Sequence, residues 1–210
     1  VTAIDKKTKT VMVQNLMTGE KFSDTYDKLV ISTGAKPKQL SIPGIDRAHS
    51  LRNVTDADRI KSAIEATTHK SAVILGAGFI GVELAENLVH LGLSVTIVQR
   101  GPSLLAMFDP EMVQPLRERL EKHGIRVVLN AEAEKITATH VYLTNGQSLD
   151  AGLVFSAAGV EPDNALAKEA GLKIGATGGI YHGKATNYSS IRELALKTIN
   201  NGCGGDAPEN

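Results

Sequence analysis

A short glycine-rich segment between a buried run and an amphipathic repeat most limits how this chain can fold. Residues 72–75 form a continuous apolar run, residues 76–81 read GAGFIG, and apolar residues then recur every three or four positions up to Leu91. This order of patterns predicts a strand, a tight turn and a helix. A second apolar run at 95–98 follows Gly92, so the sequence predicts a βαβ unit with parallel strands.

In a GxGxxG turn that binds a dinucleotide, each of the three glycines is required for a different physical reason. Gly76 permits the tight turn, Gly78 lets the backbone approach a pyrophosphate, and Gly81 allows the helix to pack closely on the strand. The amides at the start of the helix and the helix dipole then face the anion. We predict dinucleotide binding by Gly76, Ala77, Gly78, Phe79, Ile80 and Gly81, with a glycine turn that only serves packing as the alternative.

The end of the next predicted strand bears on the choice between NAD and NADP. A carboxylate about 20 residues after the glycines would bind the hydroxyls of the adenosine ribose. This position holds Gln99, which is followed by Arg100. A glutamine can bond a ribose hydroxyl without repelling a 2′-phosphate, and an arginine beside it can attract one. We therefore expect NADPH to be used at least as well as NADH, unless Arg100 is only a solvated surface charge.

The first third of the chain predicts short strands and one helix. Alternating apolar residues and the turn at 18–19 indicate a β-meander that ends in a buried run at 29–31. Residues 36–43 contain prolines near both ends and predict a crossing loop. A capping box that begins at Thr55 predicts a helix of about three turns ending near residue 68.

The part after the βαβ unit continues the alternation of helix and strand. Asp109-Pro110 predicts the start of a helix and Gly124 its end, and residues 125–129 predict a third parallel strand. The turn Asn145-Gly146 predicts a hairpin, and another buried run follows at 153–157. The fold class expected is α/β, with a Rossmann-like doubly wound parallel sheet and a β-meander.

Composition excludes several functional classes. The 210 residues contain 23 Lys and Arg and 23 Asp and Glu, so we expect no basic face for nucleic acid or anionic lipid. The longest mostly apolar stretch, residues 71–82, is shorter than the ~20 residues that cross a bilayer, so no membrane partner is expected. The single cysteine, Cys203, provides neither an internal disulfide nor a CxxC pair, which favours a cytoplasmic protein.

Several linked segments resemble the pyridine nucleotide-disulfide oxidoreductases. They are YDKLVISTGAKP at 26–37, IPG at 42–44, LRNVTDADRI at 51–60, GAGFIGVE at 76–83 and ALAKEAGLKIGATGGI at 165–180. The resemblance is strongest for the branch of CoA-disulfide reductases, persulfide reductases and water-forming NADH oxidases. It implies an enzyme that uses FAD and NAD(P)H and passes hydride from NAD(P)H to flavin and on to a thiol or disulfide substrate. It also implies a homodimeric parent protein.

The resemblance implies a domain order as well, because this family inserts an NAD(P) domain into a flavin domain. Residues 1–53 would be a partial FAD-domain segment, residues 54–153 the NAD(P)-binding domain, and residues 154–210 the return into the FAD domain with a divergent tail. We expect a fragment without the family's first flavin fingerprint, its redox cysteine and its dimerisation domain, and hence inactive alone. Glu161 stands where family members often carry arginine.

The resemblance assigns roles to single residues. Phe79 is similar to the aromatic gate that stands against the isoalloxazine ring, and Glu83 to the carboxylate that positions the nicotinamide. Thr33 and Gly34 resemble the loop that closes over FAD, and Gly159 resembles the glycine along the nicotinamide half. A core aromatic at Phe79 and a helix N-terminal acid at Glu83 are the structural alternatives.

Other functions remain open at this point. The chain could be a stand-alone NAD(P)H-binding module without catalysis, or a fragment of a water-forming NADH oxidase or a ferredoxin reductase. A third possibility is a partner-binding fold in which the glycine turn has lost its ligand. Binding of NAD(P)H with a rise in melting temperature separates the first two from the third.

Overall fold

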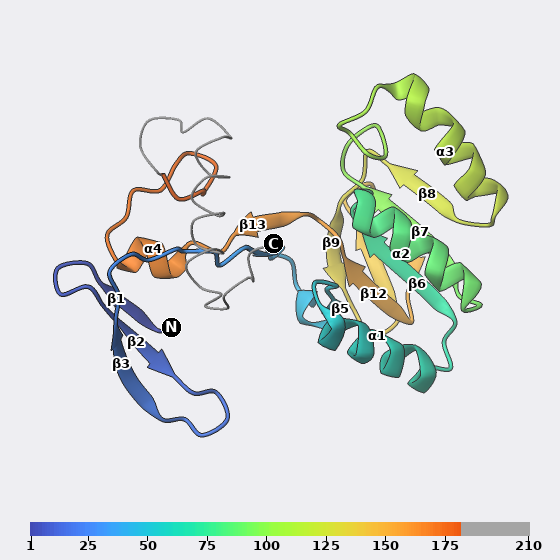
Figure 1. Ribbon diagram of the computed structural model, residues 1–210. Helices are drawn as coiled ribbons and strands as arrows, with labels where there is room; N and C mark the ends of the chain where they lie inside the picture. Colours follow the sequence, from blue (N-terminus) through green and yellow to red (C-terminus); the bar gives the residue numbers. More distant parts are fainter. Residues whose placement is uncertain (182–210) are drawn as a thin grey trace, which may run out of the picture. The chain divides into compact units, whose positions relative to one another are not determined.

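A computed structural model describes residues 1–181 of the chain, and contacts within it divide the chain into two compact units (Figure 1). The terminal unit joins residues 1–33 to residues 162–181, and the central unit comprises Gly34–Glu161. Cys203 and the predicted tail lie outside the described residues.

The central unit is built on five parallel strands in the order β5-β12-β6-β7-β8. Every residue of β6 is buried, as expected for a strand covered on both faces. Leu75 of β6 lies opposite Val98 of β7, so the predicted parallel neighbours are confirmed. The strands are β5 (Ala48–His49), β6 (Ser71–Leu75), β7 (Ser94–Gln99), β8 (Arg126–Leu129) and β12 (Leu153–Ser156).

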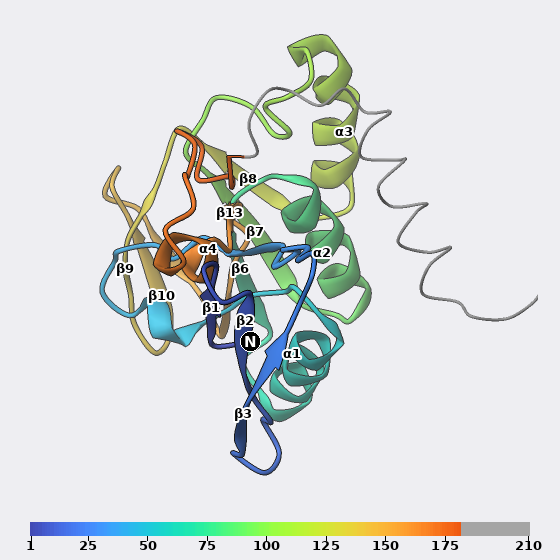
Figure 2. The same cartoon turned by 60° about the vertical axis from the view of Figure 1, so that its left-hand side comes forward.

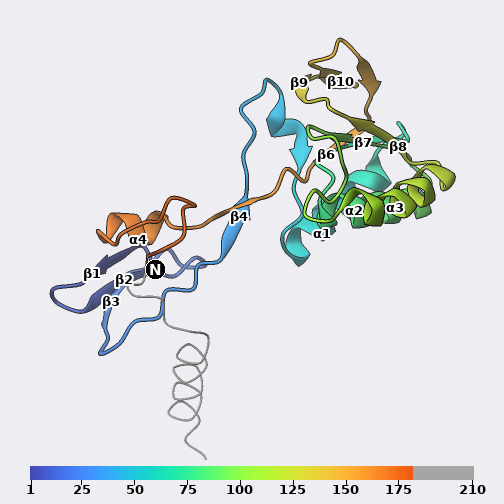
Figure 3. The same ribbon diagram turned by 90° about the horizontal axis from the view of Figure 1, so that it is seen from above.

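Helices cover one face of this sheet. One apolar core joins α1 (Val54–Ala66), α2 (Phe79–His90) and α3 (Pro110–Lys122) to the sheet residues Ile74 and Ile97. Figure 3 shows the three helices together on one side of β6 and β7. The predicted α/β class with a parallel sheet is confirmed.

A three-stranded antiparallel sheet covers the other face. It consists of β9 (Ala133–Ile136), β10 (His140–Leu143) and β11 (Ser148–Asp150), in the order β11-β10-β9. A second apolar core packs its residues, Val141 among them, against residues of the parallel sheet such as Val73. The predicted hairpin at Asn145-Gly146 joins β10 to β11, with Gly146 at a φ of 83°.

The terminal unit contains the predicted β-meander. The antiparallel strands are β1 (Ala3–Asp5), β2 (Thr10–Gln14) and β3 (Lys21–Thr25), and α4 (Ala165–Glu169) lies beside β1 (Figure 1 and Figure 2). The prediction of a buried run at 29–31 is wrong, because these residues form no strand and Val30 is 67% exposed. A run of three apolar residues is too short to show a helix or strand periodicity, so it does not indicate which element would bury it.

Residues 36–43 are neither a helix nor a central strand, as predicted. The short strand β4 (Ala35–Pro37) forms a two-stranded sheet with β13 (Val160–Pro162), and a 3₁₀ turn at Ile45–Arg47 follows. Lys36 Nζ lies 3.4 Å from Glu161 Oε1. Glu161, where relatives of this pattern often carry arginine, therefore forms an ion pair with Lys36 on the neighbouring strand.

Two details of the helices differ from the predictions. Helix α1 begins at Val54, because the capping box is formed by Asn53 and Asp56, with the Asp56 amide donating to Asn53 Oδ1 at 2.9 Å. In α2 the predicted apolar stripe includes Ile80 and Leu91, which are 45% and 59% exposed. Small residues displace the stripe, because α2 buries Gly81 and Ala85 beside Leu84 and Leu88.

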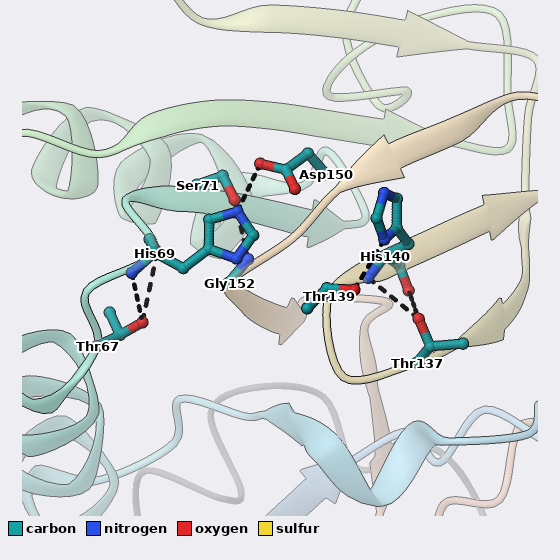
Figure 4. A network of polar contacts seen from close by, with 8 residues as sticks. All are labelled: Thr67, His69, Ser71, Thr137, Thr139, His140, Asp150 and Gly152. Carbon is teal, nitrogen blue, oxygen red and sulfur yellow. Dashed lines mark hydrogen bonds and ion pairs between the residues drawn. The ribbon is translucent and has the colours of Figure 1, made fainter.

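A polar network joins the end of β11 to the start of β6 (Figure 4). His69 Nε2 lies 2.8 Å from Asp150 Oδ2, and the Gly152 amide donates to Ser71 Oγ at 2.9 Å. The hydrogen bond from His69 lowers the pKa of the Asp150 carboxyl, and burial opposes this shift. The network thus connects the antiparallel sheet to the parallel sheet, and the Asp150 carboxylate is its charged acceptor.

The contact between His69 and Asp150 should make the free energy of unfolding depend on pH. Since the pKa of Asp150 is lowered on folding, the ionised carboxylate stabilises the fold above about pH 4, and this contribution is lost as the pH falls through the folded pKa. Asp150→Asn should cost about 1 kcal/mol or less at pH 7, because exposed pairs are weak. Thermal unfolding from pH 7 to pH 3 should show the difference from wild type disappear in acid. Asp58→Asn, at an exposed site, is the control, and a difference independent of pH would contradict this account.

Candidate dinucleotide site

The GxGxxG turn lies at the carboxyl end of β6. From β6 the sheet continues to β7 and β8 on one side, whereas β12 lies on the other side. The turn thus lies where the strand order changes direction. In open parallel sheets this is the edge at which ligands bind.

Gly76 meets a requirement of the fold. Its φ is 111°, a backbone conformation that residues with a side chain rarely adopt, and its amide donates to Val98 O at 2.8 Å. A Cβ at this position would lie 2.3 Å from Ala157 O. The close passage of the end of β12 therefore explains why the first glycine must be a glycine.

Gly81 is also explained by packing. A Cβ on Gly81 would lie 2.2 Å from Gly76 O, so the lack of a side chain lets the first turn of α2 approach the glycine turn. Gly81 itself is buried. The GxGxxG pattern predicts this same role for Gly81, which is close packing of the helix on the strand.

Gly78 has no such explanation within the protein. Its φ is −78°, which any residue adopts, and a Cβ there would meet nothing within 4 Å. The residue is exposed at the N-terminus of α2. Folding does not require a glycine here, whereas close approach of a ligand to the backbone does.

The first turn of α2 offers unengaged donors beside this open space. Gly78 is the N-cap residue and makes no side-chain capping bond, and the first intrahelical bond runs from the Val82 amide to Gly78 O at 3.0 Å. The amides before Val82 therefore have no acceptor inside the helix. Together with the helix dipole they form a site for an anion.

Gln99 supports the turn from the end of β7. Its Oε1 accepts a hydrogen bond from the Ala77 amide at 3.2 Å, and the Leu105 amide donates to Ala77 O at 2.9 Å. Ala77 is therefore held through both of its backbone groups, and its side chain is buried. Arg100 is exposed, and its Nε lies 3.5 Å from Glu132 Oε1.

Two aromatic rings lie at the start of α2. Phe79 is 54% exposed, which is unusual for a core aromatic, and its ring meets that of Phe108 edge to face with centroids 5.9 Å apart. Glu83 is exposed, one turn further along α2. Sequence reasoning missed Phe108, because it precedes the start of α3 and belongs to no periodic pattern.

The other predicted site residues are distributed over both units. In the central unit, Gly34 and Gly159 have φ values of 71° and 97°, and Gly159 O accepts from the Lys38 amide at 3.0 Å. Thr33 belongs to the terminal unit, where its hydroxyl donates to Asp163 O. The structure therefore brings Gly76–Gly81 and Gln99 together in one site and places Thr33 in the other unit.

Two further features are absent from the described part of the chain. Residues 1–181 contain no group of three or more His, Cys, Asp or Glu side chains arranged to hold a metal ion. None of the helices in that range has the length and apolar character needed to span a membrane.

Comparison with known proteins identifies the family of this chain. Residues 1–190 match the family of pyridine nucleotide-disulphide oxidoreductases. The coenzyme A disulfide reductase of Staphylococcus aureus (strain JH9) is 31% identical over 174 residues, which make up 83% of this chain and 40% of that protein. The chain therefore spans about 40% of the length of the curated relatives that it matches.

Solved structures with similar folds come from the same group of enzymes. The structure of reduced Bacillus anthracis CoADR-RHD matches with a TM-score of 0.82 and 37% identity, covering 85% of this chain and 33% of that one. The NAD-dependent persulfide reductase from A. fulgidus matches with a TM-score of 0.78 and 35% identity, covering 84% of this chain and 34% of that one. With the glycine turn, its parallel neighbours and these matches, the chain belongs to the pyridine nucleotide-disulphide oxidoreductase family.

Proposed function

We propose that this chain binds a pyridine dinucleotide, NADH or NADPH, at the glycine turn. The diphosphate would lie against the amides at residues 78–81, where the helix dipole and unengaged donors favour an anion. The observation that carries this proposal is the open space at Gly78. A Cβ at this position would meet nothing within 4 Å, so packing within the protein does not explain the glycine. Ala77 and Gln99 would keep the turn in shape while the ligand binds.

The second part of the proposal concerns the reaction of the whole protein. Family membership and the relatives support an FAD-dependent oxidoreductase, in which FAD accepts a hydride from NAD(P)H and passes electrons to a disulfide. Phe79 would stand against the nicotinamide and flavin rings, since it is half exposed at the first turn of α2. Glu83, exposed one turn later, would position the nicotinamide. This chain's task is to hold and orient the dinucleotide.

The flavin side would involve Thr33 and Gly34, and the nicotinamide half would involve Gly159. Both glycines have left-handed φ values, and the Thr33 hydroxyl fixes its own loop by bonding Asp163 O. The acceptor we propose is a CoA-disulfide or a persulfide, as the names of the relatives suggest. A cytoplasmic, homodimeric parent protein completes the proposal.

The proposed domain order follows that of the family. Residues 1–53 and 154–210 would belong to a flavin domain, and residues 54–153 would form the inserted NAD(P) domain. An inserted domain is supported by the continuity of the central unit in sequence, whereas the terminal unit is assembled from two separate segments. The central unit, Gly34–Glu161, extends beyond residues 54–153 at both ends, because β5 and β12 belong to its parallel sheet.

The binding proposal is tested on the 210-residue chain by thermal unfolding with NADH, NADPH, ADP-ribose or adenosine. Ligand at about 100 times its dissociation constant should stabilise the fold by about 2.7 kcal/mol. We expect NADH or NADPH, and also ADP-ribose, to raise the melting temperature, because all three carry the diphosphate. Adenosine at the same concentration should have little effect. If neither dinucleotide nor ADP-ribose shifts the transition at millimolar concentration, the proposed site is wrong.

A further inference from the structure

If a dinucleotide binds at the glycine turn, the charge at the end of β7 bears on the choice between NADH and NADPH. This region contains an acid that the sequence pattern does not reveal. Gln99 ends the strand and Arg100 follows it. Glu132 lies more than thirty positions later in the chain, yet its Oε1 is 3.5 Å from Arg100 Nε. The side chains of Arg100 and Glu132 are 78% and 52% exposed, so the pair faces solvent.

The backbone holds this acid in place. The Asn130 amide donates to Gly101 O at 3.1 Å and the Ala131 amide to Gln99 O at 3.2 Å, so the loop after β8 is bonded to the loop after β7. The backbone of Glu132 is also bonded to Thr144: the Thr144 amide donates to Glu132 O at 2.9 Å, and the Glu132 amide donates to Thr144 Oγ1 at 3.3 Å. The backbone of Glu132 is therefore held near that of Arg100 by hydrogen bonds other than the ion pair.

Gln99 contributes a donor to the same region. Because the Ala77 amide can only donate, the side-chain oxygen of Gln99 must face the turn, which leaves Nε2 as the outward group. Nε2 lies 3.4 Å from the position of a Cβ on Gly101, so it points toward the loop that follows β7. A 2′-phosphate would find this donor, the cation of Arg100 and the anion of Glu132 within one short stretch of surface.

We propose that Glu132 is a specificity residue, which neutralises Arg100 and thereby lowers the affinity for NADPH relative to NADH. The inference rests on the proposed binding of NAD(P)H at the glycine turn. A 2′-phosphate is attracted by an arginine, and a carboxylate paired with that arginine cancels much of the attraction. NADH carries only a hydroxyl at that position, so its affinity should depend little on Glu132.

The test is isothermal titration of the 210-residue chain with NADH and with NADPH. Glu132→Gln keeps the backbone bonds to Thr144 and should strengthen NADPH binding about threefold, which is the scale of an exposed charge interaction, while NADH binding stays within a factor of two. The double variant Arg100→Gln with Glu132→Gln should lose this gain. Glu134→Gln is the matched control, since Glu134 is an exposed acid of β9 that forms none of the ion pairs found in residues 1–181.

The outcomes separate this inference from the function on which it rests. If wild type binds neither nucleotide, the proposed function fails. If both bind and Glu132→Gln leaves the ratio of the two affinities unchanged, or if Glu134→Gln changes the ratio equally, the role given to Glu132 is wrong. A gain that persists without Arg100 would also overturn it. The gain should shrink in high salt, since the charges are exposed.

Discussion

Replacing Gly76 by alanine should destabilise the central unit by about 3 kcal/mol or more. Two effects add at this position. The φ of 111° is strained for any residue with a side chain, and the new Cβ would lie 2.3 Å from the backbone oxygen of Ala157. Ala157 follows β12 directly and its amide donates to Leu75 O at 2.8 Å, so neither segment can move without breaking the sheet. Urea denaturation at 25 °C, followed by circular dichroism, measures the loss.

Gly92→Ala is the matched control for this experiment. Gly92 also has a left-handed φ, 82°, but a Cβ there would meet nothing within 4 Å. It should therefore cost only the backbone strain of about 1–2 kcal/mol. If Gly76→Ala were no more destabilising than Gly92→Ala, the close approach of β12 to the glycine turn would not be a real constraint.

Replacing Gly78 by valine should abolish dinucleotide binding with little harm to the fold. The Cβ would extend into open space, so the main cost to the fold should be the poorer N-cap, about 1 kcal/mol, and the melting temperature should fall by only a few degrees. The Cβ and methyl groups would also occupy the path of a diphosphate to the amides of the first turn of α2. A loss of about 100-fold in affinity for NADH corresponds to about 2.7 kcal/mol, which is the strength of one or two charged hydrogen bonds. Isothermal titration with NADH and ADP-ribose measures the effect.

A valine at Gly179 serves as the control for Gly78→Val. Gly179 has no left-handed φ, and its nearest neighbour to a new Cβ is Thr177 Oγ1 at 3.9 Å, so the substitution is similarly tolerated. It belongs to the terminal unit and should leave NADH affinity unchanged. Retention of wild-type affinity by Gly78→Val would show that the ligand does not approach this backbone.

Much of the central unit could be predicted because its signals are local. Strand β6 is a run of buried residues, α2 follows the N-cap residue Gly78 and ends before Gly92, and α3 starts at a proline after Asp109. Periodicity, caps and turn residues are properties of neighbouring positions, so one sequence suffices to recognise them. The site residues Gly76–Gly81 were predicted together for the same reason.

What the sequence could not predict depends on contacts between distant residues. Strand position alone predicts that Gln99 can bond a ribose hydroxyl, whereas in the fold its oxygen bonds the Ala77 amide 22 positions earlier. The sequence offers Arg100 as an attractor of a 2′-phosphate or as a solvated charge, and it does not reveal that Glu132 lies beside it. The exposed positions of Ile80 and Leu91 follow from tight packing of small residues in α2, which hydrophobic spacing alone does not encode.

The most direct test of the central claim is a titration of ¹⁵N-labelled protein with ADP-ribose, followed amide by amide by NMR. If the diphosphate lies against the start of α2, the largest shift changes should occur at Gly78, Phe79, Ile80 and Gly81, with smaller ones at Ala77 and Gln99. The terminal meander, β1 to β3, should change little. Binding that leaves the amides of residues 78–81 unshifted, and instead perturbs another surface, would contradict the account.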